Sequence, residues 1–289
     1  MFTPKLIVTD LDGTALNNNK EITTETIKAF ERCRKKGIHI AIATARYIVG
    51  ASYYAKKLHA DFQILTDGTL VYENGRLVYS RTMTKDMTND IINELKKYDC
   101  TSHIAIPTTT ALYRFPANIA NPAAAGINTA ANGKKTENQS FNNIKQDHSP
   151  GIYFDIDKSF PEEACKIVAH ISDNNIAKAI ADKCGCEYFH YRGETTYTFF
   201  HKKASKLDAI KHMADYLDIS LKDICAFGDD INDIEMIEHC GYGIAMANAF
   251  DNALFLYPPF EHLALYAHFH RRCRIGAKKL VVAVLNFSL

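Results

Sequence analysis

Short apolar runs alternate with helical patterns at both ends of this 289-residue chain, and a segment of different texture separates the two stretches. In the first stretch, residues 6–9, 38–43 and 62–65 are apolar runs of strand length, and residues 23–36 and 46–58 have helical spacing between them. Two parallel strands need a long crossover connection, usually a helix, so this alternation is typical of parallel βαβ units. The fold class is therefore predicted to be α/β, with a Rossmann-like parallel-sheet core.

The same alternation returns towards the C-terminal end. A capping pattern at residues 205–208 opens a predicted helix, and two further apolar runs follow it at 224–227 and 242–246. We therefore expect both ends of the chain to contribute strands to one sheet.

The segment between the two stretches mixes strand and helix patterns without the regular alternation. We expect a core domain of residues 1–79 and 201–289, interrupted by a smaller α/β domain of residues 80–200. Within the insert, residues 117–148 are rich in Asn, Ala, Thr and Lys, and we expect a mobile loop there. The remaining patterns predict helices at 88–98 and 161–171 and strands at 151–156, 186–191 and 195–200.

Composition and charge argue against several classes of protein. The net charge is +1 and basic residues are not interleaved with aromatic ones outside the tail, so we expect no nucleic-acid partner. No apolar run approaches the ~20 residues that span a bilayer, and the N-terminus has no signal-peptide pattern, so we expect no membrane partner. The eight cysteines show no repeated metal-ligand spacing, and we expect a protein of the reducing cytoplasm.

Two carboxylates, Asp10 and Asp12, follow the first apolar run and give the strongest chemical signal. Residues i and i+2 of a strand point to the same side, and carboxylates that close repel each other unless a cation or a proton separates them. Gly13 allows a sharp turn directly after them. A calcium loop would use Glu21 as its last ligand, but it would need glycine where Ala15 stands and a helix before the loop. The pair therefore predicts a reactive site that binds a different metal.

Further polar clusters follow predicted strands or open a predicted helix. Thr44 has two interpretations, because its hydroxyl could cap the next helix or could bind a phosphate together with the free N–H groups of that turn. Lys206 in a first helical turn is unfavourable unless an anion lies nearby, whereas Asp233 in such a turn needs no functional explanation. Ligands of open α/β sheets bind at the carboxyl ends of the strands, where these clusters are expected. The clusters are Thr44-Ala45-Arg46, Lys206 and Asp229-Asp230-Ile231-Asn232-Asp233.

In order and placement, the clusters resemble the motifs of the haloacid dehalogenase superfamily of phosphohydrolases. Asp10-Leu11-Asp12-Gly13-Thr14 resembles the first motif, Thr44 the second, Lys206 the third and Gly228-Asp229-Asp230-Ile231-Asn232-Asp233 the fourth. The insertion between the second and third motifs resembles the Cof-type branch, which implies a cap domain of the α/β type IIB. The resemblance covers both core segments and implies a Mg²⁺-dependent phosphatase that hydrolyses a small phosphorylated metabolite, such as a sugar phosphate.

The same resemblance implies a role for each site residue. Asp10 attacks phosphorus and forms an aspartyl-phosphate, while Asp12 protonates the leaving oxygen and then activates water. Mg²⁺ is held by the Asp10 carboxylate, the Asp12 backbone carbonyl and Asp229, with Asp233 in support. The phosphoryl oxygens are held by Thr44, Ala45, Arg46, Lys206 and Asn232. Two alternatives stay open, a phosphomutase or phosphotransferase on the same scaffold and a non-catalytic sugar-phosphate sensor.

Departures from the family pattern carry hypotheses of their own. Ala45 and Asp230 replace usual glycines, and Asp67 stands where many relatives have asparagine. The negative charge of Asp67 and Asp230 predicts a bias against highly anionic substrates. The tail at 254–289 departs most, and it has three interpretations: a divergent helix and strand, a shifted reading frame, or a basic surface element that contacts a partner. Neither the substrate nor the oligomeric state follows from the sequence.

Overall fold

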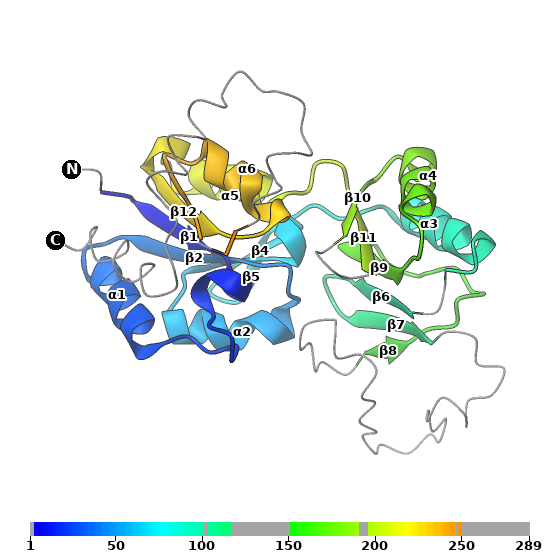
Figure 1. Cartoon of the computed structure of the whole chain (residues 1–289), viewed down its shortest axis with the longest axis horizontal. Coiled ribbons are helices and arrows are strands. Elements are labelled where there is room, and N and C mark those ends of the chain that lie inside the picture. The colour runs from blue at the N-terminus through cyan, green and yellow to red at the C-terminus, as the bar shows by residue number, and fades with distance from the viewer. Residues whose placement is uncertain (1–2, 101–102, 117–150, 191–195, 247, 250–289) are drawn as a thin grey trace, which may run out of the picture. The chain divides into compact units, whose positions relative to one another are not determined.

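The computed structural model describes residues 3–100, 103–116, 151–190, 196–246 and 248–249 (Figure 1). The chain separates into two compact units, one formed by Met1–Ser80 with Ser205–Leu289 and the other by Arg81–Ala204. The expected loop at 117–148 and the three interpretations of the tail at 254–289 lie outside the described residues.

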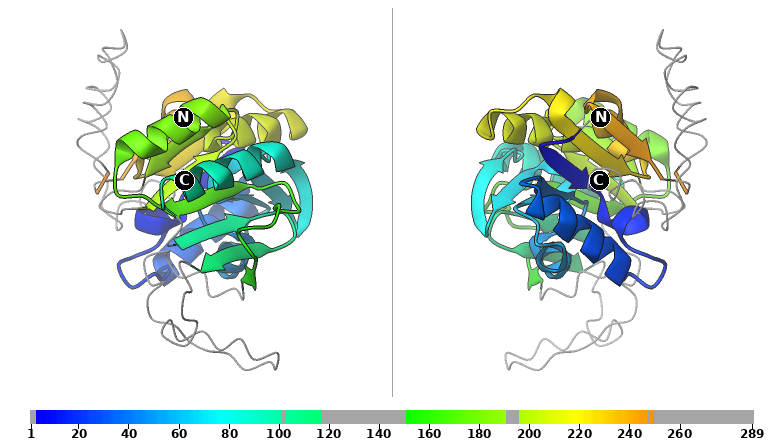
Figure 2. Two further views of the ribbon diagram at one scale, coloured as in Figure 1. Left: turned by 90° about the vertical axis from the view of Figure 1, so that its right-hand side faces the viewer. Right: turned by 90° about the vertical axis from the view of Figure 1, so that its left-hand side faces the viewer.

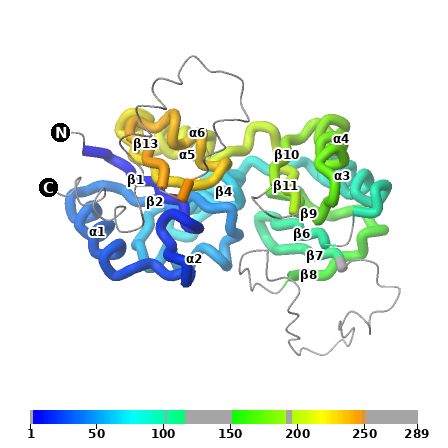
Figure 3. Tube along the Cα trace, viewed as in Figure 1, coloured from blue at the N-terminus to red at the C-terminus, as the bar shows by residue number. Residues whose placement is uncertain are grey.

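The first unit is built on a seven-stranded sheet in the order β13-β12-β1-β2-β3-β4-β5. The strands from β13 to β3 run parallel, which confirms the predicted parallel-sheet core, and β4 and β5 add an antiparallel hairpin at one edge. The blue start of the chain lies beside the orange later part in Figure 3. Leu6 of β1 pairs with Ile224 of β12. The strands are β1 (Leu6–Thr9), β2 (His39–Ala43), β3 (Phe62–Leu65), β4 (Leu70–Glu73), β5 (Arg76–Ser80), β12 (Ile224–Gly228) and β13 (Tyr242–Ala245).

Helices cover both faces of this sheet, with α1 and α2 on one side and α5 and α6 on the other (Figure 1, Figure 2). α1 begins where the Thr23 hydroxyl accepts a hydrogen bond from the Thr26 N–H, and α5 begins where the Ser205 hydroxyl accepts one from the Asp208 N–H. The central strands are therefore buried on both faces, as parallel sheets require. The helices are α1 (Thr24–Lys35), α2 (Ile48–Leu58), α5 (Lys206–Tyr216) and α6 (Ile234–His239).

The second unit has a six-stranded sheet in the order β10-β11-β9-β6-β7-β8. Two helices pack against each other and share one apolar core with this sheet. The unit is thus a smaller α/β body, as expected for the insert. Its elements are α3 (Lys85–Lys97), β6 (His103–Pro107), β7 (Leu112–Pro116), β8 (Ile152–Tyr153), β9 (Lys166–His170), α4 (Asn174–Cys184), β10 (Glu187–His190) and β11 (Thr196–Phe200).

The predicted helix at 161–171 is wrong. Residues Lys166–His170 form β9, which pairs with β11 on one side and β6 on the other. Ile167, Val168 and Ala169 are consecutive apolar residues and all are buried, so the middle of this inner strand has no polar alternation to distinguish it from a buried helix. A helix in this region begins later, where the Asp173 carboxylate accepts a hydrogen bond from the Asn175 N–H. Among the described helices, none has the length and apolar character needed to cross a membrane.

Candidate active site

The predicted site residues of the first unit gather at one edge of its sheet. Asp10, Thr44 and Asp229 each come directly after a strand, namely β1, β2 and β12. These strands are parallel neighbours, so their carboxyl ends meet. Lys206 is the first residue of α5, and its side chain reaches the same place.

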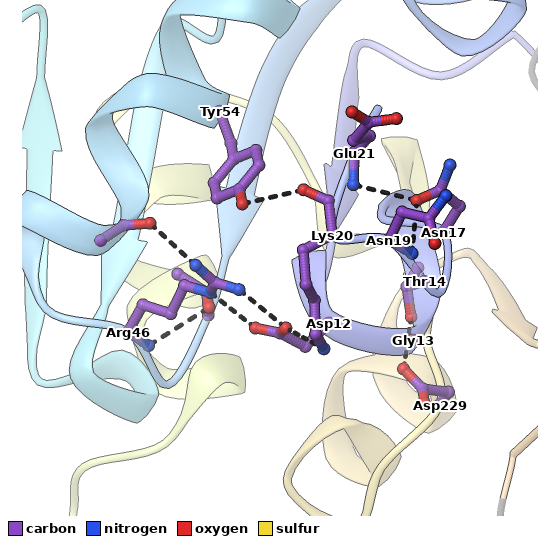
Figure 4. Close-up of polar contacts among 12 residues, drawn as sticks. Asp12, Gly13, Thr14, Asn17, Asn19, Lys20, Glu21, Arg46, Tyr54 and Asp229 are labelled. Carbon is purple, nitrogen blue, oxygen red and sulfur yellow. Dashed lines mark hydrogen bonds and ion pairs between the residues drawn. The ribbon is translucent and has the colours of Figure 1, made fainter. Parts of the chain in front are cut away.

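The turn after β1 holds the two acidic motifs together. Gly13 has φ +85°, and a Cβ atom there would lie 2.1 Å from Asp229 Oδ2, so only glycine fits. The Thr14 hydroxyl donates a hydrogen bond of 2.7 Å to Asp229 Oδ1 (Figure 4). The Asn248 amide donates to both the Gly13 carbonyl, at 3.0 Å, and Asp229 Oδ2, at 2.8 Å. Sequence reasoning missed Asn248, because only the folded chain brings it to Gly13.

Lys206 is the buried cation of the site, with 1% of its surface exposed. Its Nζ donates to Asp10 Oδ1 at 2.8 Å and to Asp233 Oδ1 at 2.6 Å. Burial alone would lower the pKa of Lys206, but the negative charges of Asp10 and Asp233 outweigh it and raise the pKa. Burial raises the pKa of Asp10 well above its ordinary value, and the repulsion of Asp233 and Asp229 adds to this against the opposing pull of Lys206.

Asp10, Asp229 and Asp233 form a cluster in which one carboxylate oxygen of each lies within 4.8 Å of the others. With all groups ionised, three carboxylates and the one lysine give −3 + 1 = −2, and buried charge of this kind needs compensation. Burial raises the pKa of Asp229 to about 6, with smaller contributions from Asp233 and Asp230 against the Thr14 hydrogen bond. Oxygen donors with a net charge of −2 fit a hard divalent cation such as Mg²⁺.

Asp233 also fixes the loop that carries the cluster. Its Oδ2 accepts hydrogen bonds from the backbone N–H groups of Asp229, at 2.9 Å, and Asp230, at 3.0 Å. Both carboxylate oxygens of Asp233 are thus engaged, one by this loop and one by Lys206. The sequence offered a bland explanation for Asp233 as an acid in a first helical turn, but its contacts join it to the site.

Asp12 lies outside the cluster and has its own cations (Figure 4). Arg46 binds it with two hydrogen bonds, from Nε to Oδ2 at 2.7 Å and from Nη2 to Oδ1 at 2.9 Å, and Lys20 Nζ donates to Oδ1 at 2.8 Å. Burial would raise the pKa of Asp12, but Arg46 and then Lys20 hold it well below its ordinary value. Because β1 ends at Thr9, the side chains of Asp10 and Asp12 do not follow strand geometry. The expected repulsion between them is replaced by ion pairs with different cations, Lys206 for Asp10 and Arg46 and Lys20 for Asp12.

The remaining predicted phosphate-binding residues also lie at this edge. The Thr44 hydroxyl accepts a hydrogen bond from the Arg46 N–H at 3.2 Å. The N-cap residue of α2 is Tyr47, so Thr44 does not cap that helix. Ala45 lies between Thr44 and Arg46 in the same turn. The Asn232 amide donates to Asp67 Oδ1 at 2.7 Å.

Asp67 itself is buried and has φ +61°, a left-handed conformation that asparagine and aspartate tolerate better than most residues. Its carboxylate directs the Asn232 side chain and so connects the end of β3 with the fourth motif. The residues resembling all four motifs are thus brought together, and Lys20, Asp67 and Asn248 join them.

The sequence and the fold of this chain are similar to those of known proteins. The family model of haloacid dehalogenase-like hydrolases matches residues 7–255. The chain is 27% identical over 271 residues to the phosphatase YwpJ of Bacillus subtilis, covering 85% of this chain and 90% of that protein. Its fold is similar to that of a haloacid dehalogenase subclass IIB sugar phosphatase, with a TM-score of 0.70 at 19% identity over 86% of this chain and 90% of that one. A phosphatase of the same superfamily from Bacteroides thetaiotaomicron gives a TM-score of 0.74 at 18% identity, covering 99% and 95%.

Proposed function

Since the chain belongs to the haloacid dehalogenase-like hydrolase family, we propose that it is a Mg²⁺-dependent phosphatase of a small phosphorylated metabolite, such as a sugar phosphate. The observation that carries this proposal is the buried cluster of Asp10, Asp229 and Asp233 beside Lys206, which has a net charge of −2 when all four groups are ionised. A family member with that cluster has both a carboxylate nucleophile and a place for a divalent cation.

Asp10 is the proposed nucleophile. Lys206 holds its Oδ1, which fixes the carboxylate at the end of β1 and leaves Oδ2 to attack phosphorus. As the new bond from Asp10 to phosphorus forms, the bond from phosphorus to the leaving oxygen breaks, and an aspartyl-phosphate results. Water then hydrolyses this intermediate and frees the carboxylate. Dividing the displacement into two steps is the usual benefit of covalent catalysis.

Asp12 is the proposed proton shuttle. It gives a proton to the leaving oxygen in the first step and takes one from the attacking water in the second. The ionised form that Arg46 and Lys20 hold is the form needed as a base. The acid step needs a protonated carboxyl, which requires substrate to draw Arg46 away from Asp12. This exchange is consistent with the proposed role of Arg46 in binding the phosphoryl group.

The proposed Mg²⁺ ligands are the carboxylates of Asp10 and Asp229 and the backbone carbonyl of Asp12, with Asp233 holding the loop in place. When bound, Mg²⁺ would neutralise the cluster and polarise the phosphoryl group. Lys206, Thr44, the Ala45 turn and Asn232 are the proposed contacts to the phosphoryl oxygens, and the inserted unit is the proposed determinant of substrate choice.

The test is Mg²⁺-dependent release of phosphate from p-nitrophenyl phosphate. We expect Asp10→Asn to abolish it and EDTA to suppress it in the wild type. Asp157→Asn is the matched control, because Asp155-Ile156-Asp157 repeats the Asp-x-Asp spacing of Asp10 and Asp12 and the Asp157 side chain is 78% exposed. Equal activity of Asp10→Asn and the wild type would refute the assigned nucleophile. A burst of p-nitrophenol without phosphate would favour a phosphotransferase, and binding without turnover a sensor.

A further inference from the structure

The loop after the first motif contributes a cation to Asp12 that the motifs do not include. Lys20 Nζ lies 2.8 Å from Asp12 Oδ1, on the same oxygen that Arg46 Nη2 contacts at 2.9 Å. The backbone of Lys20 has φ +59°, in a turn that its N–H closes by donating to the Asn17 carbonyl at 2.9 Å. The Lys20 backbone thus has a conformation that non-glycine residues rarely adopt, and this turn fixes the point from which the flexible lysine side chain extends.

Tyr54 of α2 contacts both residues that hold Asp12 (Figure 4). Its hydroxyl donates a hydrogen bond of 2.9 Å to the Lys20 carbonyl. Its ring lies under the Arg46 guanidinium, with Cζ 4.9 Å from the ring centroid, in a cation–π contact. Tyr54 is only 7% exposed, so its ring has little freedom to move.

We propose that Lys20 and Tyr54 are positioning residues that set the place of the Asp12 carboxyl for proton transfer to the leaving oxygen. This inference rests on the proposed function, in which Asp12 is the proton shuttle. Arg46 binds the carboxyl with two hydrogen bonds and Lys20 binds it with one, so Lys20 is the contact that keeps the carboxyl in place once substrate draws Arg46 away. Tyr54 orients both cations at once, since it bonds to the Lys20 backbone and stacks on Arg46.

A misplaced proton donor has a kinetic signature that a loosened fold does not share. As the bond from phosphorus to oxygen breaks, the proton of the Asp12 carboxyl moves to the departing oxygen and leaves the carboxylate behind. A basic leaving group such as phenolate needs that proton, whereas 2,4-dinitrophenolate departs without it. Because kcat/KM reports the steps from free enzyme through this cleavage, only the poor leaving group should suffer.

The test compares Lys20→Met and Tyr54→Phe with the wild type on phenyl phosphate and 2,4-dinitrophenyl phosphate. Tyr54→Phe keeps the ring over Arg46 and removes only the hydroxyl that bonds to Lys20. The matched controls are Lys57→Met and Tyr53→Phe, because Lys57 Nζ lies 4.7 Å from the Tyr53 ring centroid and Tyr53 is 59% exposed on the same helix.

We expect Lys20→Met to lower kcat/KM about tenfold or more for phenyl phosphate and less than about twofold for the dinitrophenyl ester, since general acid catalysis supplies ~10²–10⁴-fold in all. Tyr54→Phe should change in the same direction by a smaller factor, and the controls should not change. Equal losses for both esters, or no loss, would overturn the positioning role while the wild type still releases phosphate. A wild type without Mg²⁺-dependent release from either ester would instead overturn the proposed function and this inference with it.

Discussion

Replacing Lys206 with methionine removes the cation that lies between Asp10 and Asp233, at 2.8 and 2.6 Å from their oxygens. Methionine keeps the length and apolar stem of lysine, so the change removes charge more than volume. Asp10, Asp229 and Asp233 then face one another within 4.8 Å without their lysine. Breaking a buried ion pair by removing one partner costs ~3–5 kcal/mol, so we expect the metal-free variant to be destabilised by this amount.

The loss of stability in Lys206→Met depends on pH, and the structure defines the direction of this dependence. Burial and neighbouring carboxylates raise the pKa of Asp10, so its ionised form is the one that needs Lys206. The deficit of Lys206→Met is therefore largest at neutral and alkaline pH, and it decreases as the pH falls through the raised pKa of Asp10. Added Mg²⁺ should restore part of the lost stability, because it supplies positive charge to the same carboxylates.

The assay is urea unfolding followed by circular dichroism in EDTA, repeated with Mg²⁺ and at several pH values. Lys211→Met is the matched control on the same helix, where Lys211 Nζ lies 3.2 Å from Asp208 and the two side chains are 50% and 37% exposed. An exposed pair contributes ~0–1 kcal/mol, so this control should unfold close to the wild type. If the two variants lose the same small amount at neutral pH, the claim that the carboxylate cluster depends on Lys206 is refuted.

Three further outcomes follow from individual residues. Gly13→Ala should lower both the melting temperature and the Mg²⁺ affinity more than the control Gly75→Ala. Both glycines have left-handed φ values, but only at Gly13 would a new Cβ meet a side chain, that of Asp229. Equal effects of the two substitutions in calorimetry would contradict the close contact between Gly13 and Asp229. Protons compete with Mg²⁺ for Asp229, whose pKa is raised to about 6. The increase in melting temperature that Mg²⁺ causes should therefore decrease as the pH drops below about 6. An increase that does not depend on pH would contradict the role of Asp229 as a Mg²⁺ ligand. Burial raises the pKa of the Cys186 and Cys240 thiols to about 12. Mass spectrometry should therefore find that iodoacetamide does not alkylate them at pH 8 until the protein unfolds. Rapid alkylation of the folded protein would argue against their burial.

The core fold could be predicted from the sequence because its signals are local. The Thr23 and Ser205 caps and the apolar runs of the central strands lie within a few residues of the features that they define. The edge hairpin was missed although Asn74-Gly75, with φ values of +48° and +84°, is a standard hairpin turn. The helix predicted at 161–171 was wrong because no local signal was present there. An inner strand that is buried on both faces has no alternation of polar and apolar residues to identify it as a strand.

Contacts within the site depend on the folded chain, and the sequence predicts them less well. Asn248 reaches Gly13 across 235 positions, and Asn232 reaches Asp67 across 165. Lys20 is close to Asp12 in sequence, yet its role depends on a left-handed turn and on Tyr54 from another element. Residue types and motif order therefore predict which side chains meet, but not which partner each one binds.

Asp10 and Asp12 show how two acids separated by one residue can acquire different chemistry. Their spacing predicted one repelling pair, but the strand ends before them, and the two side chains bind different partners, Lys206 for Asp10 and Arg46 and Lys20 for Asp12. The charges that most raise the pKa of Asp10 are Asp233 and Asp229, and Asp12 is not among them, while Arg46 and Lys20 lower the pKa of Asp12. A carboxylate in an acidic cluster suits a metal-assisted nucleophile, and one between two cations suits a proton shuttle whose state changes when substrate competes for a cation. The division of work thus arises from the different surroundings of the two carboxylates, and exchanging the two environments, rather than the two residues, would be needed to exchange their roles.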